Sequence, residues 1–586
     1  EGTAGDITIA PGAQISGGAN GLVLAAAPNV TNRGTIQVGT GGQAALIAGI
    51  GVAYDNNLTS FNPQGPNQTT PQFTNDDSTN ILRFANYGTL TDGNGRDITP
   101  VGKLTVDPDA LVYAPQGNVT LLGGSVAQNG AVIATTSVQR PGSIVIEAMY
   151  EAGGTVTVAG NTLFDPAAYG PYNGVVAFGY SGAVTFGANA LTTVLPDAAS
   201  PPTNNVASSL APFKTSSGLS VVMTTPLPTS GAGLISVVGQ AIDVQSESLL
   251  YAPGQNIALN VVSQPDPRVP PVAGAGRIYV EPGAVLDVSG IPDVQLPANA
   301  NLLTLKLAGN ELADSPLQQG TFLLGASVTV DLSNNGTNAE TGESWVGTPL
   351  ANLASYLNLV QLSIDRVLVN GGAIQLSAPE VVTAAGSVIN LTGGYLDFAA
   401  GMVGTTRLIG SDGRLYSMAN ANPDITYVGI AGQFIVNHPH WNVQDIYFDP
   451  LLSGAYYQPE YVQGGNAGSL SIAAGMTSVL AGSILANAIA GTFQVTSGNL
   501  PSGGTFFFTG GTEPIEIGDP TIADAMSAQA AAALTTPSGF SMSSPSLATS
   551  PTYATTVLDS RPLSDANFSS ISITAEAGSI AEDAGA

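Results

Sequence analysis

The chain has 586 residues and a formal net charge of −28, because 41 acidic residues outnumber 13 basic ones. This charge argues against nucleic acid or an anionic membrane as a partner. Only 9% of the residues are charged and 44% are hydrophobic, so the chain can bury a core under a surface made mainly of Thr, Ser, Asn, Gln and Gly. Cysteine is absent, which excludes disulfides and thiolate metal sites and would suit export of a long rod as an unfolded chain.

No targeting or membrane segment is expected. Residues 1–6 have neither a basic start nor an apolar run, so the sequence does not open with a signal peptide. The longest charge-free apolar region, residues 476–495, is interrupted by Ser, Thr, Asn and Gly, which fits stacked strands better than a membrane span.

A strand, a tight turn and a second strand recur along the chain. Residues 5–17 have this order, with alternating apolar residues on both sides of a Pro-Gly pair, and residues 276–290, 372–391 and 468–485 repeat it. Two short strands joined by a tight corner cannot bury their apolar faces alone, so the repeat predicts a solenoid of stacked coils with parallel pairing. The inward positions should include Val280, Val288, Ile374, Leu376, Ile472 and Ile484.

Residues 21–49 carry a resemblance to a known family. An apolar strand ends in Ala27-Pro28, Asn32-Arg-Gly-Thr-Ile36 follows, and Gly42-Gln-Ala-Ala-Leu-Ile-Ala-Gly49 closes the stretch. This succession resembles the rungs of filamentous-haemagglutinin-like exoproteins of bacterial two-partner secretion. The resemblance implies an all-β fold, a right-handed parallel β-helix, which we expect to carry loop insertions and one or two short helices.

The composition divides the chain into alternating coils and insertions. We expect β-helix coils over 1–50, a polar insertion over 51–100, β-helix with irregular loops over 101–290, an insertion over 291–370, β-helix over 371–400, a loop-rich insertion over 401–467, β-helix over 468–518, an Ala/Ser/Pro-rich segment over 519–569 and a terminal coil over 570–586.

The resemblance is strongest between residues 276 and 475. The segments that carry it are 310–315, 340–350, 405–410, 427–432 and 437–441. The family implies export through an outer-membrane pore-forming partner and a secreted, extracellular or cell-surface location. It supplies no activity for this stretch.

Two helices are expected within the insertions. Thr348-Pro349 is a suitable helix start, and apolar residues from Leu350 to Ile364 recur at helical spacing, which predicts a helix near 348–366 lying against the rod. A second candidate runs from Asp519-Pro520 to Leu534.

Six charged residues are the candidates for an active site. Arg407, Asp412 and Arg414 are close in sequence and are followed by Asp424, Asp445 and Asp449, a set that suits acid–base or calcium-supported cleavage of an acidic polysaccharide. No motif assigns roles to them, and charged residues on insertions usually form solvated loops. We therefore assign no catalytic residue, and their convergence in one groove is the observation that would favour an enzyme.

The only histidines are His438 and His440. At this spacing they can point the same way from a strand towards a metal ion. The sequence implies no third ligand, so packing of His438-Pro-His-Trp441 against the rod is the favoured interpretation, and no metal or cofactor is assigned.

Other polar patterns are explained without ligands. Asn118 and Asn390 lie in Asn-x-Ser/Thr sequences, but we expect them in polar ladders between coils rather than under glycans. Acidic loops such as Asp76-Asp77 lack the Gly-Gly-x-Gly-x-Asp repeat of calcium-binding rolls, so calcium stays an open question.

Neither end of the chain has the sequence of a polar cap. Residues 1–17 open with a full rung and residues 570–580 again have strand, corner and strand, so we expect either a longer parent rod or end-to-end self-association. The favoured function is a secreted or cell-surface structural or adhesive rod or fibre segment that mediates attachment or forms extracellular matrix or filaments. Its expected partners are glycans or proteins on host or neighbouring cells. The alternative is a polysaccharide-active β-helix lyase or hydrolase.

Overall fold

The computed structural model describes most of the chain. The described residues are 5–49, 51–55, 83–87, 102–151, 156–158, 161–164, 179–203, 233–261, 276–313, 315–338, 342, 344–441, 443–449, 455–475, 478–511, 514–518, 556–575 and 580–582. The candidate helix over 519–534 lies outside these residues.

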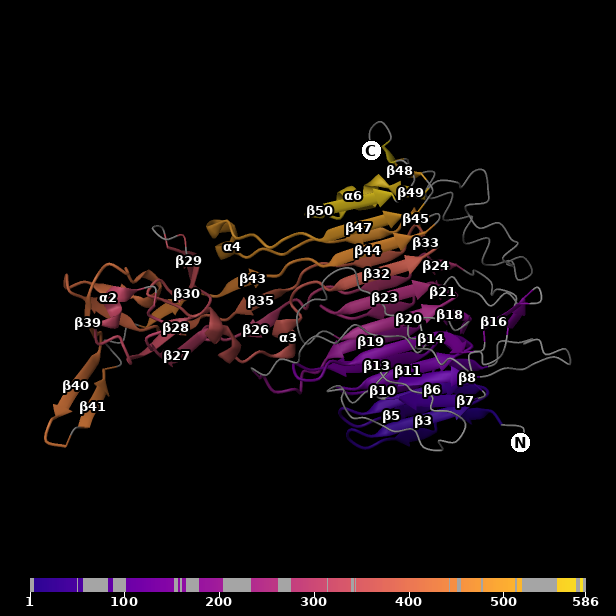
Figure 1. Ribbon diagram of the computed structural model, residues 1–586, viewed down its shortest axis with the longest axis horizontal. Helices are drawn as coiled ribbons and strands as arrows, with labels where there is room; N and C mark the ends of the chain where they lie inside the picture. The colour runs from indigo at the N-terminus through magenta and orange to yellow at the C-terminus, as the bar shows by residue number, and fades with distance from the viewer. Residues whose placement is uncertain are drawn as a thin grey trace.

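Three long sheets run side by side along a solenoid (Figure 1). Sheet A contains, in spatial order, β1 (Ile7–Ile9), β4 (Val30–Asn32), β9 (Lys103–Val106), β12 (Ser125–Gln128), β18 (Ala183–Phe186), β21 (Ala241–Val244), β24 (Arg277–Val280), β33 (Glu380–Thr383), β45 (Ser478–Leu480), β49 (Thr556–Asp559), β48 (Ile515–Gly518) and β51 (Ile580–Glu582). Sheet B contains β2 (Gln14–Ser16), β5 (Thr35–Gln37), β10 (Leu111–Ala114), β13 (Ala131–Thr136), β19 (Leu191–Pro196), β22 (Leu249–Tyr251), β25 (Val285–Asp287), β34 (Val388–Asn390) and β46 (Ser483–Leu485).

Sheet C completes each coil. It contains β3 (Leu22–Ala27), β6 (Gln43–Ala48), β11 (Asn118–Gly123), β14 (Ser143–Glu151), β20 (Leu234–Gly239), β23 (Asn256–Val261), β32 (Ala373–Ala378), β44 (Ser469–Ala474), β47 (Thr505–Gly510) and β50 (Ser570–Ala575). Neighbouring strands along these paths pair in parallel, for example β24 with β33 and β32 with β44. The predicted parallel solenoid is therefore confirmed.

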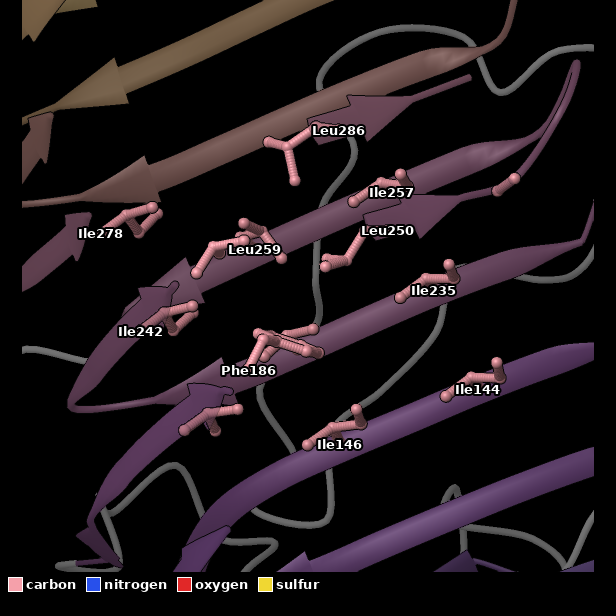
Figure 2. Packing of buried hydrophobic residues seen from close by; sticks show 14 of the residues in the cluster. Ile144, Ile146, Phe186, Ile235, Ile242, Leu250, Ile257, Leu259, Ile278 and Leu286 are labelled. Carbon is pink, nitrogen blue, oxygen red and sulfur yellow. The ribbon is translucent and has the colours of Figure 1, made fainter. Parts of the chain in front are cut away.

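One continuous apolar core lies between the three sheets. Alternate residues of each strand point inward, so Ile242, Ile278 and Leu286 from successive strands meet in the interior (Figure 2). All six residues expected to face inward are buried in this core: Val280, Val288, Ile374, Leu376, Ile472 and Ile484. The two-residue alternation of the sequence thus determines which side chains face this core, although strands such as β6 and β11 are buried on both faces.

The corner after β24 explains the recurrent Pro-Gly pair. Gly283 has a φ of 84°, a conformation that glycine adopts without strain, and the Ala284 N–H donates to the Glu281 carbonyl across the turn at 3.1 Å. The chain thereby turns from sheet A into sheet B within a few residues.

Polar ladders link successive coils, as the sequence predicts for Asn118 and Asn390. Ser143 donates to Asn118 Oδ1 at 2.6 Å, and Asn390 Nδ2 donates to Asp287 Oδ2 at 3.0 Å. Each partner is one coil away, so these side chains are satisfied along the axis of the solenoid.

Short strands also lie outside the three parallel paths. β7 (Gly51–Asp55) pairs with β8 (Arg83–Tyr87), β14 also pairs with β8 and β17 (Gly179–Ser181), and β15 (Val156–Val158) pairs with β16 (Asn161–Phe164).

A lobe beside the solenoid is built from insertions after β25 and β34 (Figure 1). It comprises β26 (Val294–Leu296), β35 (Tyr395–Phe398) and β43 (Tyr461–Gly464); β27 (Leu302–Lys306) and β28 (Ser327–Asp331); β29 (Asn335–Thr337), β30 (Ser344–Thr348) and β31 (Ala351–Asn352); β36 (Gly401–Val403) and β42 (Tyr456–Gln458); β37 (Arg407–Gly410), β38 (Leu415–Ser417) and β39 (Tyr427–Ile430); β40 (Gln433–His438) and β41 (Val443–Phe448). The short helices α2 (Pro316–Gln319) and η2 (Met418–Asn420) also belong to it. Its own core joins residues of both insertions, such as Leu353 and Leu408.

The expected helix over 348–366 is wrong. The segment instead begins with the last residue of β30 and continues through β31. It then forms a 3₁₀ helix, η1 (Ala354–Leu359), and a single helical turn, α3 (Ile364–Val367). Its apolar residues have two separate destinations, because Leu350 and Leu353 enter the core of the lobe while Ile364 packs with Val138 of the solenoid. One straight helix cannot serve both, and Leu357 is left exposed.

The expectation that neither end is capped is also wrong for sheet B. Among the described residues this sheet ends at β46, and helix α6 (Ser560–Asp565) packs against that strand, with Leu563 and the following Ala566 in the solenoid core. A further short helix, α4 (Thr492–Ser497), packs against β43. Among the described residues no helix is long and apolar enough to cross a membrane.

Candidate contact surface on the lobe

A two-stranded hairpin, β40–β41, extends from the lobe away from the solenoid (Figure 1). Its register pairs Val436 with Asp445 and His438 with Val443. Because directly opposite residues of an antiparallel pair point to the same side, these four side chains share one face with Tyr447, two residues further along β41. We call this set, with Trp441 in the connecting turn, the hairpin face.

The hairpin face is apolar and open to solvent. Trp441 is 73% exposed and Tyr447 57%, and Val436 and Val443 are also exposed. Large apolar side chains gathered on a projecting element are typical of a surface that contacts a partner, and aromatic residues contribute most to such contacts.

His438 and Asp445 place a polar pair in the middle of this face. The Nε2 atom of His438 lies 3.0 Å from Asp445 Oδ2, and the rings of His438 and His440 lie 6.0 and 6.3 Å from the Trp441 ring. The expected packing of residues 438–441 against the rod is therefore wrong, because they form the tip of a hairpin that points away from it (Figure 1). Residues 438–441 therefore form the turn end of the hairpin and do not attach it to the solenoid.

The candidate catalytic residues lie at several separate places in the lobe. Asp412 and Arg414 lie in the turn between β37 and β38, where Arg414 Nε is 3.9 Å from Asp412 Oδ2. The Arg414 backbone N–H and the Tyr416 hydroxyl both donate to Asp412, and these hydrogen bonds lower the pKa of its carboxyl. This arrangement is that of a solvated turn with satisfied acceptors.

The remaining candidates have other surroundings. Arg407 lies on β37, the Asp424 backbone N–H binds the Asn422 side chain, Asp445 faces His438 on the separate hairpin, and the Asp449 N–H donates to the Gly432 carbonyl. Within the described part of the chain, no three His, Asp or Glu side chains come together in one possible metal-binding group. Arg407, Asp412 and Arg414 thus belong to one hairpin and Asp445 to another, while Asp424 lies in the loop between β38 and β39.

A second exposed pair adds to the apolar surface of the lobe. Met402 on β36 lies opposite Tyr457 on β42, and the two side chains are 60% and 63% exposed.

Reasoning from the sequence considered His438, Asp445 and Trp441 but missed Val436, Val443 and Tyr447. The available signal was a short run of β-branched and aromatic residues on each side of Pro439–Trp441, residues 434–436 and 446–448, which is typical of two strands of a hairpin. We found no family model, curated protein or solved structure that matches this chain.

Proposed function

We propose that this chain is a structural or adhesive segment of a secreted or surface-attached bacterial rod, and that the hairpin face is its contact site. The rod is a physical scaffold: stacked coils about 4.8 Å apart give stiffness along the axis. The lobe holds the contact site to one side of that axis. The proposed partners are proteins or glycans on host or neighbouring cells, and the proposed route of export is an outer-membrane pore-forming partner.

The observation that carries this proposal is the exposure of Trp441 and Tyr447 on a projecting hairpin. Keeping large aromatic side chains in water has no benefit for folding, so a role in contact is the physical reason to place them there. The hairpin strands contain no Lys or Arg, which favours a partner that is not strongly anionic.

The alternative of a polysaccharide-active enzyme requires an acid and a base on either side of one groove. Its candidates, Asp412 and Asp445, lie on separate hairpins, and each already has a local partner. We therefore keep the adhesive role as the proposal.

The test uses beads coated with the full chain and counts their attachment to bacterial and cultured host cells. Trp441→Ala and Tyr447→Ala should each lower the apparent affinity on the order of tenfold or more, as for aromatic residues central to an interface. Leu415→Ala is the matched control, because Leu415 is 53% exposed on a different hairpin of the same lobe. Attachment no greater than that of albumin-coated beads would refute the adhesive role.

A further inference from the structure

The outer face of sheet A carries a cluster of titratable side chains far from the hairpin face. Asp243 of β21 is in register with Tyr279 of β24, and Arg277 of β24 is in register with Glu380 of β33. Glu281 follows β24 directly. These side chains point away from the core because the residues that alternate with them, such as Ile278, point into it.

The base in this cluster, Arg277, forms an ion pair with Glu380. Arg277 Nε and Nη2 lie 3.0 and 2.6 Å from Glu380 Oε2, and both side chains are almost completely buried. This pair leaves the charges of Asp243 and Glu281 to be accounted for.

Asp243 and Glu281 are held close together at the end of β21. The Gln245 side-chain amide donates to Asp243 Oδ2 at 3.3 Å, and the next backbone N–H, that of Ser246, donates to Glu281 Oε2 at 2.8 Å. Burial, and then the nearby charge of Glu281, raise the pKa of Asp243 to about 6. No base pairs with either carboxylate among the residues that the structure describes.

Two oxygen atoms at this place lack hydrogen-bond partners. They are Oδ1 of Asp243 and the phenolic oxygen of Tyr279, both buried. The Tyr279 side chain is only 2% exposed, so water at the surface does not satisfy its hydroxyl. A buried polar atom without a partner costs about 1–3 kcal/mol, so a group that binds both atoms would stabilise the fold.

We propose that Asp243, Tyr279 and Glu281 bind a hard divalent cation, with Ca²⁺ as the best fit, between two successive coils of sheet A. The donors are all oxygen atoms, which hard cations prefer, and Ca²⁺ tolerates the irregular geometry and completes its shell with water. The cation supplies the positive charge that the two carboxylates lack. Because it joins β21 to β24, its binding stabilises the stacking of these coils.

The site contains two carboxylates, which predicts weak binding in the range of about 10⁻⁴ to 10⁻³ M that is typical of extracellular calcium modules. The inference is independent of the proposed contact function, because none of its residues lies on the lobe.

The test measures Tb³⁺ luminescence, sensitised by nearby tyrosine, in the full chain and its displacement by CaCl₂. Asp243→Asn and Glu281→Gln should each weaken the Ca²⁺-displaceable binding on the order of tenfold or more. Asp109→Asn is the matched control, because Asp109 is an exposed carboxylate in the corner after β9, the counterpart of the corner after β24. This variant should bind as the unmodified chain does.

Thermal unfolding distinguishes a bound cation from a simpler arrangement, in which Asp243 is protonated or hydrogen-bonded to a bridging water. If a cation binds here, CaCl₂ should raise the Tm of the unmodified chain but not that of the Asp243→Asn variant. Wild-type Ca²⁺ affinity in either the Asp243 or the Glu281 variant, or a Tm that CaCl₂ does not change, would overturn the proposal.

Discussion

Arg277 on β24 and Glu380 on β33 form a buried ion pair across two successive coils, with Nη2 and Oε2 2.6 Å apart. The side chains are 2% and 4% exposed, so the opposite charge of each partner offsets the cost of burying the other.

Removing one member of this pair should be costly. Glu380→Ala leaves the Arg277 guanidinium buried beside an apolar residue, and we expect the free energy of unfolding to fall by about 3–5 kcal/mol. Equilibrium unfolding in urea measures the change. The double variant Arg277→Met with Glu380→Leu removes both charges and should recover most of the loss, whereas equal losses in the single and double variants would contradict the role assigned to the pair.

The direction of each side chain should decide the effect of a new charge on the solenoid. Ile36 is fully buried in the core and its neighbour on β5, Gln37, is exposed. Ile36→Asp should lower the free energy of unfolding by several kcal/mol, on the order of the 2–7 kcal/mol for burying an unpaired polar group, and Gln37→Asp should have an effect of about 0.5 kcal/mol or less. Similar urea midpoints for the two variants would conflict with the register of β5.

The fold was predictable where one residue pattern repeats. Alternating apolar residues around Pro282-Gly283 specify strand, corner and strand, and the stacking of many such units makes the solenoid the only way to bury them. The lobe has no such repeat. The wrong prediction there is the helix over 348–366. Leu353 and Ile364 have helical spacing but are buried in different cores, which depends on tertiary packing and cannot be read from sequence periodicity.

The candidate site was only partly predictable for the same reason. The sequence identified His438 and Asp445 as chemically interesting, but their contact depends on the register of β40 against β41. The cluster at Asp243 was missed because its members come from successive coils. Asp243 and Tyr279 are in register but 36 residues apart in sequence, so no local motif links them.

Stability should depend on pH through Asp243 when divalent cations are removed with a chelator. Burial and Glu281 raise the pKa of its carboxyl from 3.8 to about 6. Tyr279 of β24 is in register with Asp243, and Arg277 lies on the same outer face of that strand. The folded state then binds this proton more tightly than the unfolded state does, so the contribution of Asp243 to stability is greatest at low pH and is lost as pH rises through about 4 to 6.

The size of this effect is at most about 3 kcal/mol, the equivalent of roughly two pKa units. Urea unfolding at several pH values measures it as the difference between the unmodified chain and Asp243→Asn, which keeps every other titrating group. If the two curves stay parallel from pH 4 to 7, Asp243 does not titrate in the way its surroundings imply.

Asp559 should control the closure of sheet B by α6. Its carboxylate accepts the Arg561 backbone N–H at the start of the helix and also binds the Arg561 guanidinium, with Nη2 2.6 Å from Oδ2, while its own side chain is fully buried. Asp559→Ala removes the helix cap and a charge-assisted contact, which predicts a loss of about 1–2 kcal/mol in the stability of α6. Because Leu563 of α6 packs in the solenoid core next to β46, opening of the helix exposes the end of that sheet.

Hydrogen exchange of the backbone amides of α6 and β46 measures this opening. Exchange in both elements should become roughly tenfold faster in Asp559→Ala, since about 1.4 kcal/mol corresponds to one decade in an opening equilibrium. Asp565→Ala is the control, because Asp565 is exposed at the other end of the same helix. Faster exchange in α6 alone, with β46 unchanged, would mean that the helix lies on the sheet without protecting it.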